Sequence, residues 1–203
     1  MSGREPLLQR SGVKKVEENR LPPNQVLTPK WPVLTHGEIP EVNLDTWRLH
    51  GWGRVRNDRA WTWEEFRSLP QVEVVSDIHC VTRWSRYDNR WRGVASREIL
   101  ERVQPLPEVR FVMVHAHGGY CANLPLEQFV AEDILFAHEH DGKPLAREHG
   151  GPCRMVVPQL YFWKSVKWVV GLEFLSVERA GFWEQYGYHM RGNPWAEERF
   201  QGR

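Results

Sequence analysis

Short runs in which apolar and polar residues alternate dominate the chain after residue 45. Alternation of this kind puts every second side chain on the same face, which is the spacing of a β-strand. Turn-forming glycines and aspartates, such as the Asp141-Gly142 pair, separate several of these runs. The pattern predicts strands at residues 46–52, 71–80, 110–116, 155–158 and 166–177.

Two short helices are expected between the strands. Thr62 and Glu65 form a capping box, in which each side chain bonds to the backbone of the other residue, and the helix that they open ends before Pro70. Ser96 is expected to cap a second helix that runs to Val103. Short helices among many strands predict a mixed α+β domain.

The N-terminal part of the chain has a different character. Residues 1–25 are polar and charged, and we expect them to form a flexible arm ahead of one domain that spans residues 26–203. Residues 27–34 include Pro29 and Pro32, and a proline restricts the residue before it to extended backbone. This segment therefore cannot be helical and is expected to lie across the folded domain.

Composition narrows the class of protein. A length of 203 residues fits a single domain with a substantial core, and a net charge of +1 gives no overall field that would favour nucleic acid. No stretch approaches the roughly 20 apolar residues that span a bilayer, and the N-terminus lacks the apolar core of a secretory signal. Three widely spaced cysteines are typical of free thiols in a reducing compartment. We therefore expect a cytoplasmic protein.

Cys80 is the first candidate for chemistry, because it stands where a predicted strand passes into a loop. Loops held by a rigid scaffold commonly carry functional side chains. Arg83 and Arg86 follow closely, and their charge is expected to favour the thiolate, the form that binds metals. The alternative is a small buried apolar side chain, which describes most free cysteines.

A second candidate region lies between residues 149 and 168. Gly150 and Gly151 allow a ligand to approach the backbone closely. Cations and a hydroxyl group, a set that matches a phosphate, follow at Arg154, Lys164, Ser165 and Lys167. A solvated basic loop is the alternative. The absence of a Walker loop or a dinucleotide glycine fingerprint argues against an ordinary nucleotide site.

Histidines occur in two pairs with a spacing of two residues, His115/His117 and His138/His140. On a strand such a pair projects from one face and can share a zinc ion, so a zinc hydrolase built on His115, His117 and Cys121 is one hypothesis. No CxxC or HExxH motif accompanies them. Histidines with structural roles, or exposed to solvent, are therefore the favoured interpretation.

Three motifs together resemble a known family. They are DIHCVTRWS at residues 77–85, GGPCRMVVP at 150–158 and KSVKW at 164–168. Their combination resembles the oxidoreductase molybdopterin-binding domain family, which includes sulfite oxidase, plant nitrate reductase and methionine-sulfoxide reductase. Short sulfite oxidase-like oxidoreductases are most similar, and they share the ending FWEQYGYH at 182–189. The likeness covers residues 25–200 and implies the sulfite-oxidase fold, a mixed, barrel-like sheet with short helices.

The resemblance implies roles for individual residues. It places the family's metal-binding cysteine at Cys80, as ligand to a molybdenum–molybdopterin cofactor, and implies no haem. Together with the predicted anion site, it places cofactor contacts at Lys30, Trp31, His115, His149, Arg154, Lys164, Ser165, Val166 and Lys167. Thr82 stands where methionine-sulfoxide reductases have glutamate, and the Gly-Asn-Arg pattern of sulfite oxidases is absent, which leaves the substrate open.

The implied activity is a two-electron oxo transfer to or from a small sulfur- or nitrogen-containing substrate. We expect Arg83 and Tyr120 to act beside Cys80 at the substrate. A nearby arginine would attract an anion, whereas tryptophan walls alone would favour a neutral molecule. Because the haem domain of larger sulfite oxidases is absent, a separate electron-transfer partner is expected. A molybdopterin-binding scaffold without turnover is the alternative.

Overall fold

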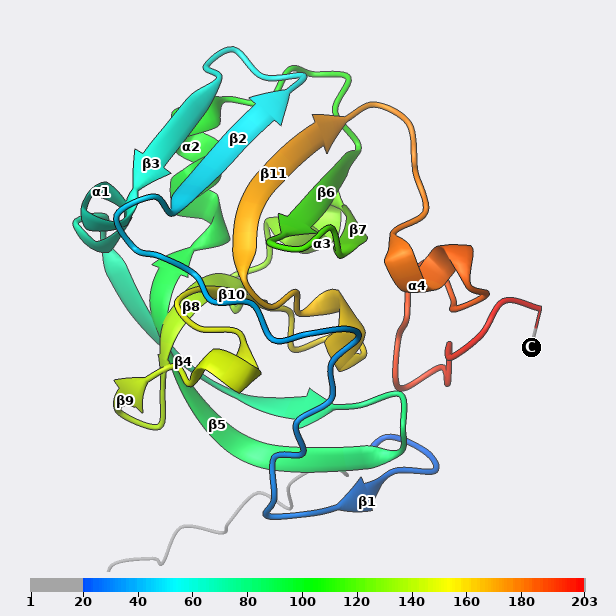
Figure 1. Cartoon of the computed structure of the whole chain (residues 1–203). Coiled ribbons are helices and arrows are strands. Elements are labelled where there is room, and N and C mark those ends of the chain that lie inside the picture. Colours follow the sequence, from blue (N-terminus) through cyan, green and yellow to red (C-terminus); the bar gives the residue numbers. More distant parts are fainter. Residues whose placement is uncertain (1–19, 203) are drawn as a thin grey trace, which may run out of the picture.

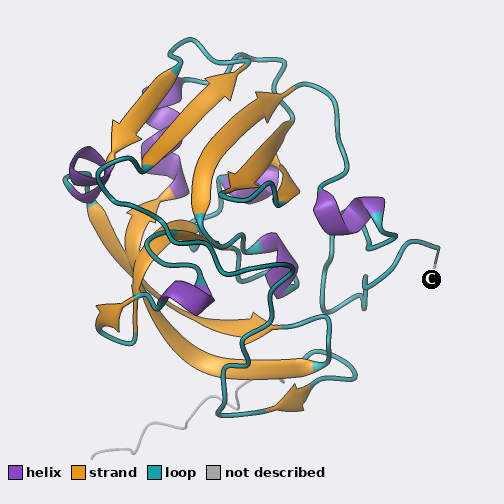
Figure 2. Ribbon diagram, viewed as in Figure 1, coloured by secondary structure: helices purple, strands orange, loops and turns teal. Residues whose placement is uncertain are grey.

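A computed structural model describes residues 20–202, in which the strands form two open sheets (Figures 1 and 2). The six-stranded sheet has the order β1-β5-β8-β10, with β4 beside β5 and β9 beside β8. Its strands are β1 (Val26–Leu27), β4 (Gln71–His79), β5 (Trp84–Ala95), β8 (Leu135–His140), β9 (Lys143–Pro144) and β10 (Arg154–Val156). The predicted mixed α+β class is confirmed. The strands form two separate sheets, and neither sheet closes into a barrel.

The five-stranded sheet has the order β3-β2-β11-β6-β7, with β11 parallel to β2 and antiparallel to β6. Its strands are β2 (Arg48–Gly53), β3 (Arg59–Thr62), β6 (Phe111–Ala116), β7 (Cys121–Pro125) and β11 (Val169–Leu175). The helices are all short: α1 (Trp63–Arg67), α2 (Ser96–Val103), α3 (Leu126–Phe129), α4 (Phe182–Gln185), and the 3-10 turns η1 (Arg147–His149) and η2 (Phe162–Lys164).

The main core draws apolar side chains from both sheets and from the helices, including Leu49, Phe66, Ile99, Phe136 and Phe174. A second, smaller cluster is centred on the buried rings and aliphatic chains of the β4–β5–β8–β10 sheet, Ile78, Trp91, Leu135 and Val156. Trp31 and Phe162 pack against this second cluster. The burial of these side chains fixes β4 and the segments on either side of β10, which carry the candidate site.

The two predicted helices differ in how their N-termini are capped. In α1 the capping box is confirmed, because the Thr62 hydroxyl accepts a hydrogen bond from Glu65 N at 3.1 Å and Glu65 Oε2 accepts one from Thr62 N at 2.8 Å. In α2 the predicted Ser96 cap is wrong. Ala95 occupies the cap position, and Ser96 Oγ donates instead to the carbonyl of Phe129 at 2.5 Å.

The strand predicted at residues 71–80 pairs with β5 as a long antiparallel hairpin. A register shift between Ser76 and Ile78 interrupts the alternation, so Ile78 and His79 are both buried and the predicted single face is wrong beyond that point. The strand predicted at 166–177 is shorter, because the residues before Val169 form a loop. β5 itself was missed, since its polar sequence hides the strand period.

Residues 1–19 of the predicted arm lie outside the described residues. The rest of that stretch contacts the domain, where the Arg20 guanidinium donates to the two carboxylate oxygens of Asp77 at 2.6 and 3.0 Å. The proline-containing segment 27–34 continues from β1 without helix and leads across the face of the molecule (blue in Figure 1). This path brings Trp31 to the candidate site. No helix within residues 20–202 is long and apolar enough to cross a membrane.

We expect the free energy of unfolding to fall as the pH drops from about 6.5 to about 4. Burial lowers the pKa of His138 from 6.5 to about 4. The unfolded chain therefore takes up the proton at a higher pH than the folded chain, and protonation favours unfolding within that window. At pH 4 this difference in proton uptake lowers the free energy of unfolding by on the order of 1–3 kcal/mol. Urea denaturation of His138→Gln across this range should give a shallower pH dependence.

His117→Gln is the matched control for this measurement, because His117 is exposed. Its denaturation midpoints should follow the same pH curve as the unmodified chain. An equally steep curve in His138→Gln would contradict the assignment of acid sensitivity to this buried ring.

Candidate cofactor and substrate site

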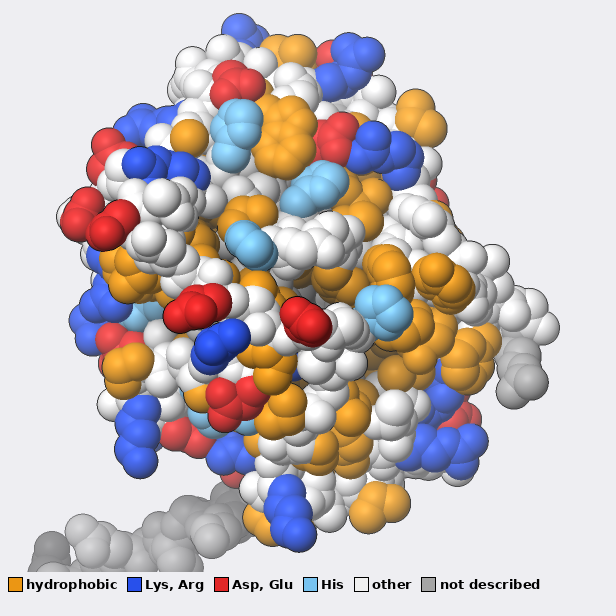
Figure 3. Space-filling model, viewed as in Figure 1, with side chains coloured by type: hydrophobic (Ala, Val, Ile, Leu, Met, Phe, Trp, Pro, Cys, Tyr) orange, Lys and Arg blue, Asp and Glu red, His pale blue; other side chains and the backbone are white. Residues whose placement is uncertain are grey.

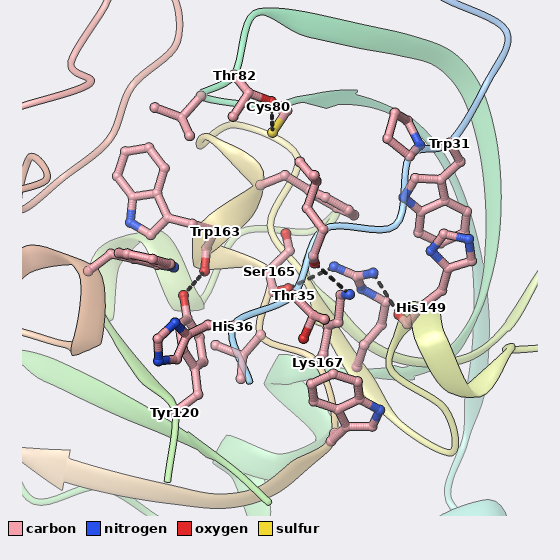
Figure 4. A pocket seen from close by; sticks show the side chains of 18 of the residues that line it. Trp31, Thr35, His36, Cys80, Thr82, Tyr120, His149, Trp163, Ser165 and Lys167 are labelled. Carbon is pink, nitrogen blue, oxygen red and sulfur yellow. Dashed lines mark hydrogen bonds between the residues drawn. The ribbon is translucent and has the colours of Figure 1, made fainter. Parts of the chain in front are cut away.

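A cavity of about 250 Å³ lies where segments distant in sequence meet (Figure 4). Its walls come from residues 31–36, from the turn between β4 and β5, from residues 162–168 and from the segment around α4. Most of the residues predicted for the site line this cavity, namely Trp31, Cys80, Tyr120, His149, Arg154, Ser165, Val166 and Lys167. The two sequence regions singled out for chemistry therefore share one space.

Cys80 is the first residue after β4 and begins the turn into β5. The turn is closed by hydrogen bonds from Cys80 N to the Trp84 carbonyl at 2.9 Å and from Arg83 N to the Cys80 carbonyl at 3.0 Å. The Cys80 sulfur lies 3.1 Å from the Thr82 hydroxyl oxygen, at the top of the cavity in Figure 4. This places the thiol at the cavity wall.

The predicted activation of Cys80 by neighbouring arginines is wrong. Arg83 has a left-handed backbone conformation, with φ of 73°, and its exposed side chain does not line the cavity. Arg86 pairs with Asp141 at 2.9 Å. Burial raises the pKa of the Cys80 thiol, and the hydrogen bond with Thr82 opposes this only in part. A bound metal ion would supply the missing positive charge and displace the thiol proton.

Arg154 is the principal cation of the site. Its side chain is buried, with 1% exposed, and its guanidinium donates to the carbonyls of His149 at 2.7 Å and Ser165 at 2.8 Å. The Phe162 ring lies 4.1 Å from the guanidinium carbon, and Arg154 Nε has no hydrogen-bond partner in residues 20–202. Burial lowers the pKa of Arg154 to about 9. A buried cation bonded only to carbonyls favours an anionic ligand.

Lys167 and His149 complete this end of the cavity. The Lys167 ammonium donates to the carbonyls of Leu34 at 2.8 Å and Glu148 at 2.7 Å. Burial, with the charge of Arg154, lowers the pKa of Lys167 to about 8. The His149 ring stacks on Trp31 with centroids 3.7 Å apart, and its buried Nδ1 has no partner within the described chain.

Gly150 makes this arrangement of cations feasible. Its φ is +107°, and a Cβ atom there would lie 2.9 Å from the Lys167 Cβ and 3.1 Å from the Arg154 Cβ. Any side chain at this position would push the two cationic residues apart. A buried guanidinium beside a half-buried ammonium at one end, and a thiol at the wall, fit a group that carries both a phosphate and a metal, such as a metal-loaded molybdopterin.

Aromatic side chains form the opposite end of the cavity. The Tyr188 ring stacks on Trp183 with centroids 5.1 Å apart and meets the edge of Trp163 at the same distance. Burial and the proximity of Cys80 raise the pKa of Tyr188. Its hydroxyl makes no hydrogen bond to another residue in the described part of the chain. Tyr188 and Trp183 were missed as site residues, although the aromatic density of residues 182–188 was a usable signal.

Tyr120 also lines the cavity, but its hydroxyl is already engaged. It donates to the Trp163 carbonyl at 2.7 Å, and burial raises its pKa well above the usual value of 10.0. The hydroxyl therefore holds the segment that carries Trp163. Between the two tyrosines, Tyr188 is the one with a free donor.

The structure places the remaining predicted residues outside the cavity lining. These are Lys30, Arg83, His115 and Lys164. His115 lies on the other sheet and bonds Glu173 at 3.1 Å. The Lys164 ammonium is buried and forms a 2.5 Å ion pair with Glu184. Within residues 20–202 no three histidine, cysteine or acidic side chains are grouped as a metal site, so the zinc hypothesis lacks its ligand set.

Comparison with known proteins identifies a matching family. Residues 36–183 match the family described as oxidoreductase molybdopterin binding domain. The chain is 45% identical to "Uncharacterized oxidoreductase YuiH" of Bacillus subtilis (strain 168), over 91% of this chain and 93% of that protein. It is 30% identical to sulfite oxidase of Arabidopsis thaliana, over 76% of this chain and 49% of the plant protein.

A solved structure shares the fold. The sulfane dehydrogenase SoxCD of Paracoccus pantotrophus superposes with a TM-score of 0.65, over 70% of this chain and 41% of that chain, at 21% identity. The chain spans about half the length of the plant sulfite oxidase and less than half of this dehydrogenase. At that identity the likeness supports the architecture and not a shared substrate.

Proposed function

Since the chain belongs to the oxidoreductase molybdopterin binding domain family and is an oxidoreductase of that family, we propose that it binds molybdenum–molybdopterin in the cavity with Cys80 as the protein ligand to the metal. One observation carries this proposal: a buried thiol lines the same cavity as a buried guanidinium that has no carboxylate partner within residues 20–202. When bound, this group supplies two-electron oxygen-atom transfer. The proposed reaction is such a transfer to or from a small sulfur- or nitrogen-containing substrate.

The chain's own residues have distinct parts in this proposal. Arg154 and Lys167 hold the phosphate with charge-assisted hydrogen bonds, and Ser165 and Val166 form the wall between them. The His149 ring, stacked on Trp31, offers its unpartnered Nδ1 to the pterin.

At the aromatic end, the Tyr188 hydroxyl donates a hydrogen bond to the substrate oxygen. This donor is held in place by the two tryptophans that pack against its ring.

Metal content and turnover test the proposal together. Protein produced in a host that makes molybdopterin should contain about one molybdenum per chain, whereas protein from a host without it should contain none. The loaded protein should reduce sulfur or nitrogen oxides with a reduced dye, or oxidise sulfur compounds with an oxidised one. Zinc in place of molybdenum would contradict the proposal.

The alternative function is a scaffold that binds molybdopterin without turnover. It predicts the same molybdenum content but no exchange of electrons with any dye in either direction. A redox titration followed by electron paramagnetic resonance separates the two functions, because an enzyme passes through the intermediate oxidation state of the metal.

A separate electron carrier belongs to this proposal, because two electrons must enter or leave for each oxygen atom transferred. The proposal includes no haem. We also propose a cytoplasmic location, on the ground that the three cysteines are free and unpaired.

A further inference from the structure

We infer that the substrate is a neutral oxide whose sulfur or nitrogen atom carries apolar groups, and not an anion such as sulfite or nitrate. The inference rests on the proposed function and concerns the end of the cavity beside Cys80. Its basis is the separation of charged and apolar side chains along the cavity walls.

The only Arg, Lys, Asp or Glu side chains that line the cavity, within residues 20–202, are Arg154 and Lys167. Figure 4 shows Lys167 on the side of His149, away from Trp163. Arg154 belongs to the same end, because its guanidinium carbon lies 5.6 Å from the centroid of the Trp31 ring. Both donate to backbone carbonyls there, and a phosphate group would take up their remaining charge. Neither cation is available to an anionic substrate.

The end beside Cys80 consists of aromatic, aliphatic and hydroxyl groups, together with the imidazole of His36, which meets the edge of the Trp183 ring with centroids 5.6 Å apart. Trp163, Trp183 and Tyr188 form its wall, and Val81 and Thr82 continue the chain from Cys80 into it. Apolar side chains also gather on the outer surface on the side of α4 (Figure 3), where Tyr186 is 71% exposed. The outer surface on the side of α4 is therefore apolar as well.

Two arginines near the Cys80 turn do not alter this distribution. Arg83 is exposed and does not line the cavity. Arg199 is buried, donates to the Val81 carbonyl at 2.5 Å and approaches Glu197 at 3.7 Å, and it too is outside the lining. Its charge lowers the pKa of the Cys80 thiol, but burial outweighs this effect and the pKa is raised.

Desolvation decides which substrate this end accepts. Moving an anion from water to an aromatic wall without a cation costs far more than moving a neutral sulfoxide, whose oxygen needs only one or two donors. The Tyr188 hydroxyl supplies a donor, and the tryptophans bury the apolar substituents. In the reductive direction the sulfur–oxygen bond breaks, an external carrier delivers two electrons, and the oxygen leaves as water with two protons.

The first test compares substrates of different charge on the molybdenum-loaded enzyme. With a reduced viologen dye as electron donor, kcat/KM for methyl phenyl sulfoxide should exceed that for nitrate by at least about 100-fold. With ferricyanide as electron acceptor, kcat/KM for sulfite oxidation should be lower than kcat/KM for sulfoxide reduction by a similar factor. If sulfite or nitrate equals or exceeds the sulfoxide, the inference is overturned while the proposed function stands. If no oxide turns over in either direction, the proposed function fails as well.

A second test installs the missing cation. Val81→Arg places a guanidinium in the wall next to Cys80, and it should raise kcat/KM for the anions by at least about 10-fold while lowering that for the sulfoxide. Val75→Arg is the control, because Val75 is 59% exposed on β4 and lies outside the cavity lining. An unchanged preference in Val81→Arg would count against the inference.

Binding to the unmodified holoenzyme gives a readout that needs no variant. Dimethyl sulfone, a neutral molecule, should quench the tryptophan fluorescence of the aromatic wall and compete with the sulfoxide. Sulfate at the same concentration should do neither. Tighter binding of sulfate than of the sulfone would overturn the inference.

Discussion

Replacing Cys80 with serine is expected to abolish turnover while leaving the fold and the cofactor in place. A serine oxygen is a harder and shorter ligand than a thiolate, so it replaces the sulfur donor poorly at a metal that cycles by two electrons. Changes in groups that merely support a metal ligand cost about 10–100-fold in activity, and loss of the ligand itself should cost more than that. Steady-state assays and electron paramagnetic resonance would measure the loss.

The cofactor should stay bound in this variant, because Arg154 and Lys167, the proposed phosphate contacts, would still hold it. Pterin content after denaturation therefore separates a lost ligand from a lost cofactor. Cys121→Ser is the control, since Cys121 is a free, half-buried cysteine outside the cavity lining. Full turnover in Cys80→Ser would refute Cys80 as the metal ligand.

Residues with local signals were the easiest to predict from the sequence. The position of Cys80 at a strand end followed from alternation in β4, and the capping box at Thr62 required only residues three apart. Arg154 followed from its place beside two glycines in a motif with a family resemblance. In each case the signal that was used lies within a few positions along the chain.

Residues whose roles depend on distant partners were harder to predict. Lys164 and Lys167 lie in one short basic run, yet only Lys167 lines the cavity. Lys164 turns inward because acceptors at Asn123 and Glu184 converge on it, 41 and 20 positions away. A spacing pattern contains no information about that convergence.

The same limit explains why Arg83 was expected at the cavity, which it does not line, and why Tyr188, which does line it, was missed. A left-handed backbone at Arg83 turns its side chain away from the cavity, and arginine carries no sequence signal for that conformation. Tyr188 reaches the cavity because its backbone forms a bridge with Phe200 and its ring packs on Trp183. These contacts arise only after the C-terminal segment has folded onto the domain.

The buried ion pair between Lys164 and Glu184 should be the main anchor of that segment. Both side chains are fully buried, and each directly follows a tryptophan of the cavity wall, Trp163 or Trp183. Trp163 Nε1 also donates to Glu184 Oε1 at 2.9 Å. The ion pair therefore holds Trp163 and Trp183, the two tryptophans of the aromatic wall, in fixed positions relative to each other.

Glu184→Ala is expected to lower the free energy of unfolding by about 3–5 kcal/mol, because it leaves the Lys164 ammonium buried without its carboxylate. Urea denaturation measures the loss. Glu108→Ala is the matched control, since Glu108 pairs with Arg54 at 3.3 Å while both side chains are about half exposed, and its loss should stay below about 1 kcal/mol.

The double variant Lys164→Met/Glu184→Leu tests the cause of the instability. If an unpaired buried charge is responsible, removing both charges should restore much of the stability that Glu184→Ala loses, because apolar replacements of a buried pair are often tolerated. The double variant should still bind the sulfoxide more weakly, with a higher KM, since the hydrogen bond from Trp163 to Glu184 is gone and the aromatic wall is less fixed. A double variant as unstable as Glu184→Ala would instead mean that packing, and not charge, holds the C-terminal segment in place.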